Sequence, residues 1–577
     1  MPRHRFIRRA LTGAALVATL ACAPAQASPT QESLVQDDPL LLGAKTQDDV
    51  DLAFRSLAGL GVDRVRVSVF WDQVAPGRDS QEKPEFSGGG SGSPASYPRA
   101  GWAPYDRIVL AAQRTGVGLL FSVTGPAPAW ATPGAHCVKA GPFRGCQEGV
   151  YKPSPEEFRL FVQAAATRYS GTYELDAPPP PKRDGFELPE LGGMNLNEPP
   201  PPAGKGTVLP RVAHWSVWNE PNYPASLLPI WRDDRPRTKS QMVGEAPAHY
   251  RKLVDAAYTA LDATGHGADT ILIGETAPRG GKNPRQLDGP MTPAEFAREV
   301  YCLDSKLAPF RGRAAALREC PRNASERREF ASRHPGLFRA QGWAHHPYSL
   351  AGGRWHPPTW RHPLPDNVPI ANLGRLTSML DRSAARWGMA EARKSIWITE
   401  YGYQTTPPDP TAGVSPARQG PLSAWGEYVA YRNPRVSTIA QFLLLDDRPL
   451  EGLAESDPGR WVTWQSGLFT VDRQPKPSLA DYRTPLHVVQ RGRSARAFGT
   501  LRPAAPGLPM NASVEFAPAN RPWRTLRTAP VSGPSGYVNL PFRVPGAGQV
   551  RLVWTDTATG GRTASDPAPV RRSGNAG

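Results

Sequence analysis

The sequence predicts an α/β fold, a (β/α)8 TIM barrel, followed by a smaller all-β domain. Short apolar runs typical of buried strands alternate with amphipathic segments typical of helices from about residue 38 to about residue 485. Eight such alternations favour a parallel barrel, in which functional side chains gather at the carboxyl ends of the strands. From about His487 the pattern changes to short alternating runs separated by turns, which favours an immunoglobulin-like β-sandwich.

The elements of the barrel follow one another in order. The predicted strands span residues 40–43, 65–71, 117–123, 212–220, 270–274, 342–347, 395–399 and 438–445. The predicted helices span residues 48–60, 105–114, 155–169, 248–261, 293–303, 373–387 and 417–431, and the last helix begins near residues 479–482. In the first helix, Val50, Phe54, Leu57 and Leu60 recur at the spacing of one helical face. The clearest strands of the β-sandwich are residues 512–516, 523–526, 537–540 and 549–554.

The length and the N-terminus divide the chain into three parts. At 577 residues the chain is too long for one average domain. A basic start, an apolar stretch at residues 14–21 and Ala25-Gln26-Ala27 predict a signal peptide over 1–27, cleaved after Ala27. The barrel then covers residues 28–486 and the β-sandwich covers 487–577. We expect a secreted protein; Sec and Tat export both stay open, and a lipoprotein anchored at Cys22 is less favoured.

The cysteines and the charge fit an exported chain. Besides Cys22 there are four cysteines, and their close spacing favours the disulfides Cys137–Cys146 and Cys302–Cys320. The chain contains no C-x-x-C spacing, so a metal site built from cysteines is not expected. The formal net charge of +16 falls to +12 without the four arginines of the signal peptide, which hints at anionic surroundings. Because no nucleic-acid-binding signature accompanies the charge, a nucleic-acid partner is excluded.

Two glutamates follow buried strands and carry the main functional signal. Glu220 stands in Trp218-Asn-Glu-Pro-Asn222 after an apolar run, and Glu400 ends Ser395-Ile-Trp-Ile-Thr-Glu400. Cleavage of a glycosidic bond needs two carboxyl groups, one to protonate the leaving oxygen and one to attack or stabilise the sugar cation. A third strand between them ends in His346-Pro347-Tyr348.

The order of these motifs resembles clan A of the glycoside hydrolases over roughly residues 38–485. The Trp-Asn-Glu-Pro-Asn motif is most similar to that of the β-xylosidase and iduronidase family (family 39) and of cellulase-like relatives. The resemblance implies a retaining enzyme with Glu220 as the general acid/base and Glu400 as the nucleophile. Asn219 resembles the residue that binds the sugar 2-hydroxyl, and Tyr348 the residue that orients the nucleophile, with His346 in the same pocket.

Further substrate-binding residues are less sharply defined. Arg66 resembles the clan arginine on the second strand, although Arg64 has the same parity. The eighth strand lacks the expected platform tryptophan, which the loop after it could supply. The candidate sugar-binding tryptophans are Trp71, Trp130, Trp461 and Trp464.

The sequence therefore predicts a secreted retaining O-glycoside hydrolase that uses two glutamates. A non-catalytic carbohydrate-binding or cell-wall-associated protein on a degenerate barrel is the alternative, and so is a transglycosylase with the same residues. We expect an oligo- or polysaccharide substrate, a monomer, no membrane span, and neither a cofactor nor a metal. The sugar and its linkage stay open.

Overall fold

The computed structural model describes residues 28–571, with gaps at 29, 87–88, 135–148, 176–205, 235–241, 282–287, 505–509, 532–534 and 556–559; within 135–148 it describes only the backbone of two short strands. The predicted signal peptide, Cys22 and the proline-rich segment at 177–203 lie outside these residues.

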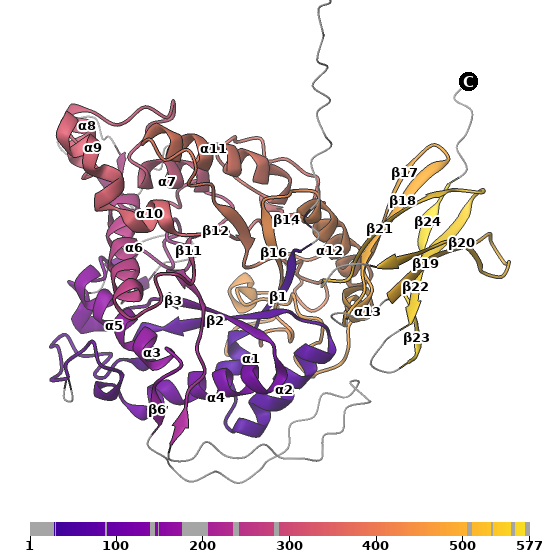
Figure 1. Cartoon of the computed structure of the whole chain (residues 1–577), viewed down its shortest axis with the longest axis horizontal. Coiled ribbons are helices and arrows are strands. Elements are labelled where there is room, and N and C mark those ends of the chain that lie inside the picture. The colour runs from indigo at the N-terminus through magenta and orange to yellow at the C-terminus, as the bar shows by residue number, and fades with distance from the viewer. Residues whose placement is uncertain are drawn as a thin grey trace, which may run out of the picture.

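Eight parallel strands form a closed barrel, which confirms the predicted parallel barrel (Figure 1). In chain order they are β1 (Glu32–Gln36), β2 (Arg64–Phe70), β3 (Gly118–Thr124), β8 (His214–Val217), β11 (Thr270–Thr276), β12 (Gly342–His345), β15 (Ser395–Ile398) and β16 (Val436–Phe442). Each strand pairs with the next, and β1 closes the ring by pairing with β16 from Glu32↔Thr438 to Gln36↔Phe442.

Helices surround the barrel. The longer ones are α2 (Gln47–Gly59), α4 (Arg99–Thr115), α5 (Pro155–Arg168), α6 (Ala246–Ala263), α7 (Pro293–Val300), α9 (Ala324–Arg333), α11 (Leu373–Arg386) and α12 (Pro416–Tyr431). The shorter ones are α1 (Asp38–Gly43), α3 (Trp71–Val74), α8 (Gly312–Leu317), α10 (Pro335–Arg339) and α13 (Ser478–Arg483). Helix α2 begins with a capping box, in which Thr46 and Asp49 satisfy each other's backbone N–H groups.

The predicted first strand, Leu40–Gly43, is wrong. These residues form the end of α1, and the first barrel strand is β1, which the sequence analysis missed. Asp37 caps the helix by accepting a hydrogen bond from the Leu40 backbone N–H, and Pro39 occupies its first turn. Aspartate followed by proline is a helix-start signal that outweighs the short apolar run after it.

Apolar side chains fill both the barrel and the space under the helices. Six strands contribute one residue each to a cluster separate from the main core: Leu34, Leu120, Leu272, Ala344, Trp397 and Ala440. The main core lies against the other side of the strands and includes Phe54, Phe161 and Trp215, all fully buried. The barrel is therefore a packed scaffold that leaves its carboxyl end for chemistry.

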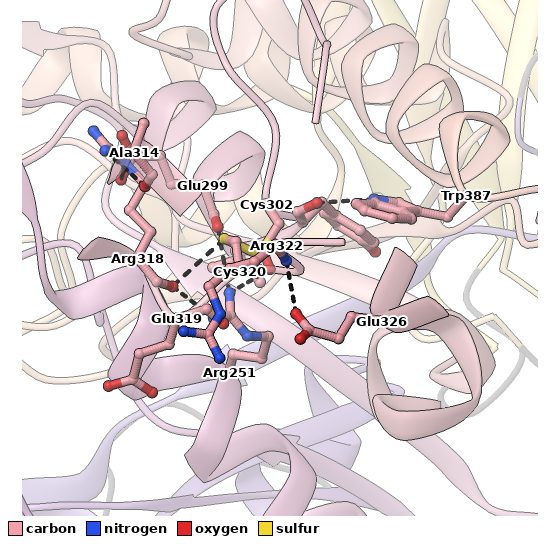
Figure 2. Close-up of a disulfide and its surroundings, with 12 residues drawn as sticks. Arg251, Glu299, Cys302, Ala314, Arg318, Glu319, Cys320, Arg322, Glu326 and Trp387 are labelled. Carbon is pink, nitrogen blue, oxygen red and sulfur yellow. Dashed lines mark hydrogen bonds and ion pairs between the residues drawn. A yellow bond between two sulfur atoms is a disulfide. The ribbon is translucent and has the colours of Figure 1, made fainter. Parts of the chain in front are cut away.

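A disulfide cross-links the segment between α7 and α9. Cys302 and Cys320 are bonded, which confirms this predicted pair (Figure 2). Beside them, the buried guanidinium of Arg251 on α6 donates to the carbonyl oxygens of Val300, Arg318 and Glu319 at 2.9–3.1 Å. One arginine thus ties both ends of the cross-linked segment to the barrel helices.

Four short two-stranded antiparallel sheets lie in the loops between the described barrel elements. They are β4 (His136–Val138) with β5 (Gly145–Gln147), β6 (Glu174–Leu175) with β7 (Thr207–Val208), β9 (Trp231–Asp233) with β10 (Met242–Gly244), and β13 (Leu350–Ala351) with β14 (Arg354–Trp355). The backbone of Cys137 lies opposite that of Cys146. Their side chains lie outside the described residues, so this disulfide stays a prediction.

The C-terminal region is built from antiparallel strands (Figure 1). One sheet contains β17 (Leu486–Arg491), β18 (Ser494–Thr500) and β21 (Tyr537–Arg543). The other contains β19 (Met510–Ala517), β20 (Arg524–Val531), β22 (Gly548–Thr555), β23 (Arg562–Ala564) and β24 (Ala568–Val570). Apolar residues from both sheets form one cluster that includes Phe542 and Trp554. An immunoglobulin-like topology stays a prediction.

Among the described residues, none of the helices combines the length and the apolar character that crossing a bilayer requires.

Candidate active site

Both predicted catalytic glutamates lie just beyond the carboxyl ends of their strands. Glu220 follows β8, and the chain turns there through left-handed backbone conformations at Trp218 (φ 63°) and Glu220 (φ 40°). Non-glycine residues adopt this region only where surrounding contacts enforce it. The Glu220 N–H donates to the Glu275 carbonyl at 2.9 Å, which fixes the turn against β11.

His346, directly after β12, joins the two glutamates. Its Nδ1 lies 2.9 Å from Glu220 Oε1 and 3.5 Å from Glu400 Oε2, and its Nε2 lies 2.8 Å from Glu275 Oε2. Burial alone would lower the pKa of His346, but the surrounding carboxylates of Glu400, Glu220 and Glu275 raise it to about 10. At neutral pH the ring is therefore an imidazolium that bridges carboxylates.

Arg66 from β2 is the second buried cation. Nη1 donates to Glu400 Oε1 at 3.0 Å and also to Gln36, Nε donates to Glu275 Oε1 at 3.2 Å, and Nη2 donates to Asn219 Oδ1 at 2.9 Å. Since Oδ1 of Asn219 is occupied, its amide nitrogen is the group left to donate to a ligand. The structure thus places Arg66 in the site, whereas Arg64 pairs with Glu32 outside it.

Glu400 is held on two sides. Besides the contact with Arg66, its Oε2 accepts a hydrogen bond from the Tyr348 hydroxyl at 3.2 Å. Burial raises the pKa of Glu400, while His346 and Arg66 oppose that rise. The side chain is 10% exposed, and that of Glu220 is 22% exposed. Glu220 is therefore the more accessible of the two.

Glu275 is the site residue that the sequence analysis missed. It is the last residue but one of β11, and its fully buried side chain is bonded to Arg66, to His346 and to the Thr399 hydroxyl (2.7 Å). Burial would raise its pKa, but Arg66 and His346 lower it to about 2. Gly274 before it is required because the Trp343 ring lies 2.5 Å from where a Cβ would stand. A carboxylate ending a buried strand was the same signal that identified Glu220 and Glu400.

The charges of the site balance when one proton is added. Arg66 and His346 carry two positive charges, and Glu275, Glu400 and Glu220 carry three negative charges if all are ionised. Burial strongly disfavours an uncompensated charge. The set is therefore neutral when one of the three carboxyl groups holds a proton.

The same groups form a set of the kind that can hold a metal ion. One ligand atom each from Glu220, His346 and Glu400 lies within 4.8 Å of the others. However, a histidine binds a metal through a nitrogen that carries no proton. In this arrangement both ring nitrogens of His346 lie within hydrogen-bond distance of carboxylates.

One of the four candidate tryptophans joins the site. Trp464 stacks on Tyr348 at 4.9 Å between ring centroids and is only partly buried, so it is the aromatic that the loop after β16 supplies. Trp461 lies in that loop with its indole N–H bonded to the Glu455 carbonyl. The prediction that Trp71 binds sugar is wrong, because Trp71 is fully buried against Phe161.

Trp130 also belongs to the core rather than to the rim. It is 9% exposed, its ring contacts Trp71 and Phe86, and its indole N–H donates to the Pro76 carbonyl. The two aspartates that follow β16 bond to neighbouring protein groups. Asp446 forms an ion pair with Lys476 at 2.7 Å, and Asp447 accepts a hydrogen bond from the Trp464 N–H.

Comparison with known proteins finds structures but no sequence relatives. No family model matches the chain, and no curated protein matches it. The chain is similar to the endo-β-1,4-mannanase from Thermotoga petrophila (10% identity, covering 95% of this chain and 98% of that one, TM-score 0.36). It is also similar to the family 1 β-glucosidase from Thermotoga maritima (11%, 79% and 97%, 0.39) and to a family 5 glycoside hydrolase from Bacteroides vulgatus (12%, 91% and 90%, 0.38). At TM-scores below 0.5 these similarities carry no argument about the chemistry of the site.

Proposed function

We propose that this protein is a glycoside hydrolase that cleaves O-glycosidic bonds with retention of configuration. The observation that carries the proposal is the pairing of Glu220 and Glu400 across His346, with carboxylate oxygens within 4.8 Å of each other. Retaining enzymes hold their two carboxyl groups about 5–5.5 Å apart, whereas inverting enzymes need about 6.5–9.5 Å to admit a water molecule. The short separation favours double displacement.

Glu400 suits the role of nucleophile. A nucleophilic carboxylate must be ionised, and Arg66 and Tyr348 both donate hydrogen bonds to its oxygens. In the first step one Glu400 oxygen bonds to the anomeric carbon as the bond to the leaving oxygen breaks. In the second step water displaces Glu400 and the sugar is released.

Glu220 suits the role of general acid and base. It is the more exposed of the two glutamates, so a leaving group and water reach it more readily. It would protonate the leaving oxygen in the first step and accept a proton from the attacking water in the second. The His346 imidazolium donates from Nδ1 to Glu220 and from Nε2 to the ionised Glu275, which fixes the orientation of Glu220.

The test uses two substitutions with different signatures. Glu400→Ala should lower turnover of an aryl glycoside by at least about 10³-fold, and azide should restore activity with inverted product. Glu220→Ala should keep activity only on substrates with good leaving groups. Glu329→Ala, on the exposed face of α9, is the folding control. Full activity of either site variant on a natural glycan would overturn the assignment.

The resemblance to family 39, cleavage of the signal peptide after Ala27 and export remain part of the proposal. Export is supported by the disulfide between Cys302 and Cys320, a bond that persists in oxidising compartments. N-terminal sequencing of protein from the culture medium should begin at Ser28. A cell-retained chain that begins at Met1 would contradict export.

A further inference from the structure

The C-terminal region concentrates positive charge beyond what the rest of the chain carries. Residues 487–577 contain twelve arginines, no lysine and three acidic residues, a formal excess of nine out of the +16 of the whole chain. One of the acids, Glu515, is already bound by Arg551 and Arg562. Arg502 pairs with Glu427 of α12, and the other arginines need another source of negative charge, or they repel one another.

Four of these arginines meet Arg432, which follows α12, in a groove of about 880 Å³ between α12 and the C-terminal strands. The described residues that line it include no acidic side chain. The arginines are Arg432, Arg491, Arg496, Arg527 and Arg543. Such a volume lies within the range of about 300–1,000 Å³ that is usual for ligand sites.

The strand register places three of the arginines on one face. Arg491 of β17 lies opposite Ser494 of β18, which lies opposite Arg543 of β21. Arg496 of β18 is two residues from Ser494, so its side chain points to the same side of the sheet. The intervening Ala495 and Phe542 have the opposite parity and belong to the core. The arginines therefore line the outer face of the sheet, which faces the groove.

Three of the five guanidinium groups are available. Arg496 donates to Asn539, and Arg432 donates to the Tyr428 hydroxyl at 3.2 Å. Arg491, Arg527 and Arg543 are exposed, and their side chains make no hydrogen bond or ion pair within the described part of the chain. By contrast, Arg502 and Arg551 in the same region are paired with Glu427 and Glu515.

We propose that this groove, the arginine groove, binds an anionic polysaccharide through its carboxylate, sulfate or phosphate groups. A guanidinium offers paired donors that match these anions, and a row of them suits a polymer with repeating charges. The choice of a polysaccharide rests on the proposed glycoside hydrolase function. A nucleic acid is disfavoured because the ring of Tyr428, which lines the groove, already packs against His487 and Phe498 rather than standing free for base stacking.

The test compares charged and uncharged forms of one polymer. The full-length protein should bind dextran sulfate and polygalacturonate and should not bind unmodified dextran. Its affinity for the two charged polymers should fall as the salt concentration rises. Arg491→Gln, Arg527→Gln and Arg543→Gln together should weaken binding by roughly tenfold or more, since three exposed charge pairs are lost. The control replaces three exposed arginines outside the groove, Arg382, Arg386 and Arg521, with glutamine, so the net charge is the same.

Three results would overturn the proposal. They are equal weakening in the two triple variants, binding of dextran as tight as that of dextran sulfate, and tighter binding of single-stranded DNA than of polygalacturonate at equal ionic strength. Circular dichroism and unchanged turnover of a small aryl glycoside check that the groove variant is folded. Binding is measured without turnover, so an inactive parent chain would contradict the proposed function while leaving the groove result readable.

Discussion

At the scale of single residues, the candidate site depends on alternating charges in a buried space. Arg66 and His346 each contact two or more carboxylates, and Glu275 is held ionised with a pKa of about 2. Removing one member of such a set leaves its partners uncompensated, which usually costs about 3–5 kcal/mol. His346 is the most informative member because its charge acts on both proposed catalytic glutamates.

The substitution His346→Gln should move the pH dependence of activity in one direction. The imidazolium lowers the pKa of Glu400, so its removal raises that pKa and a higher pH is needed to ionise the nucleophile. The acid limb of kcat/KM should shift to higher pH by about one unit or more, measured on an aryl glycoside with a good leaving group.

A matched control is His345→Gln. The neighbouring His345 is buried with its pKa lowered to about 4, so it is neutral and contributes no charge at working pH. This variant should keep the parent acid limb, even if its stability falls. An unchanged acid limb in His346→Gln would show that His346 does not set the ionisation of the nucleophile.

At the scale of elements, the site is built from the strand ends and is braced by the segments around them. β8, β11, β12 and β15 are neighbours in the barrel, so residues that follow them converge although they are distant in sequence. Outside this ring, the segment from α7 to α9 has little regular structure of its own and is braced by Arg251 and by one disulfide (Figure 2).

Replacing Cys302 and Cys320 with serine should destabilise the protein without changing the site. A bridge that closes a loop of 18 residues contributes about 3 kcal/mol, mainly by restricting the unfolded chain. Urea unfolding should therefore begin at a lower concentration. A reductant should lower the urea midpoint of the parent chain towards that of the variant. It should lower the midpoint of the variant by less. Equal unfolding of parent and variant would contradict a stabilising role for this bridge.

At the scale of the whole molecule, α12 joins the barrel to the C-terminal strands (Figure 1). Glu427 on α12 accepts hydrogen bonds from Thr500 and Arg502 at 2.6 and 2.8 Å. Trp425 stacks on His487, and Tyr431 packs on Phe498. This buried interface of charges and rings indicates a fixed arrangement rather than a flexible tether.

A shortened chain that ends at Pro485 should still turn over small aryl glycosides. It keeps every residue of the candidate site but exposes the aromatic face of α12, so we expect its melting temperature to fall on the order of 5–10 °C. Calorimetry and a turnover assay measure the two effects separately. A shortened chain that is folded by circular dichroism but inactive on every substrate of the full chain would show that the C-terminal strands contribute to the site.

The sequence by itself determined the barrel, one disulfide and the positions of Glu220 and Glu400. Those features are local: an apolar run marks a buried strand, and a polar residue at its end must lie at the barrel's carboxyl face. The error at Leu40–Gly43 was also local, because three leucines and a glycine fit a strand and a helical turn equally well.

Only the tertiary structure decided which side chains share the pocket. The choice between Arg66 and Arg64 depends on depth inside the barrel, and the recruitment of Glu275 depends on β11 lying beside β12. Likewise, Trp71 is buried and Trp464 stacks on Tyr348 because of how helices and loops cover the strands. Sequence patterns record the periodicity of one segment, whereas contacts between segments depend on barrel closure and packing, which no single segment encodes.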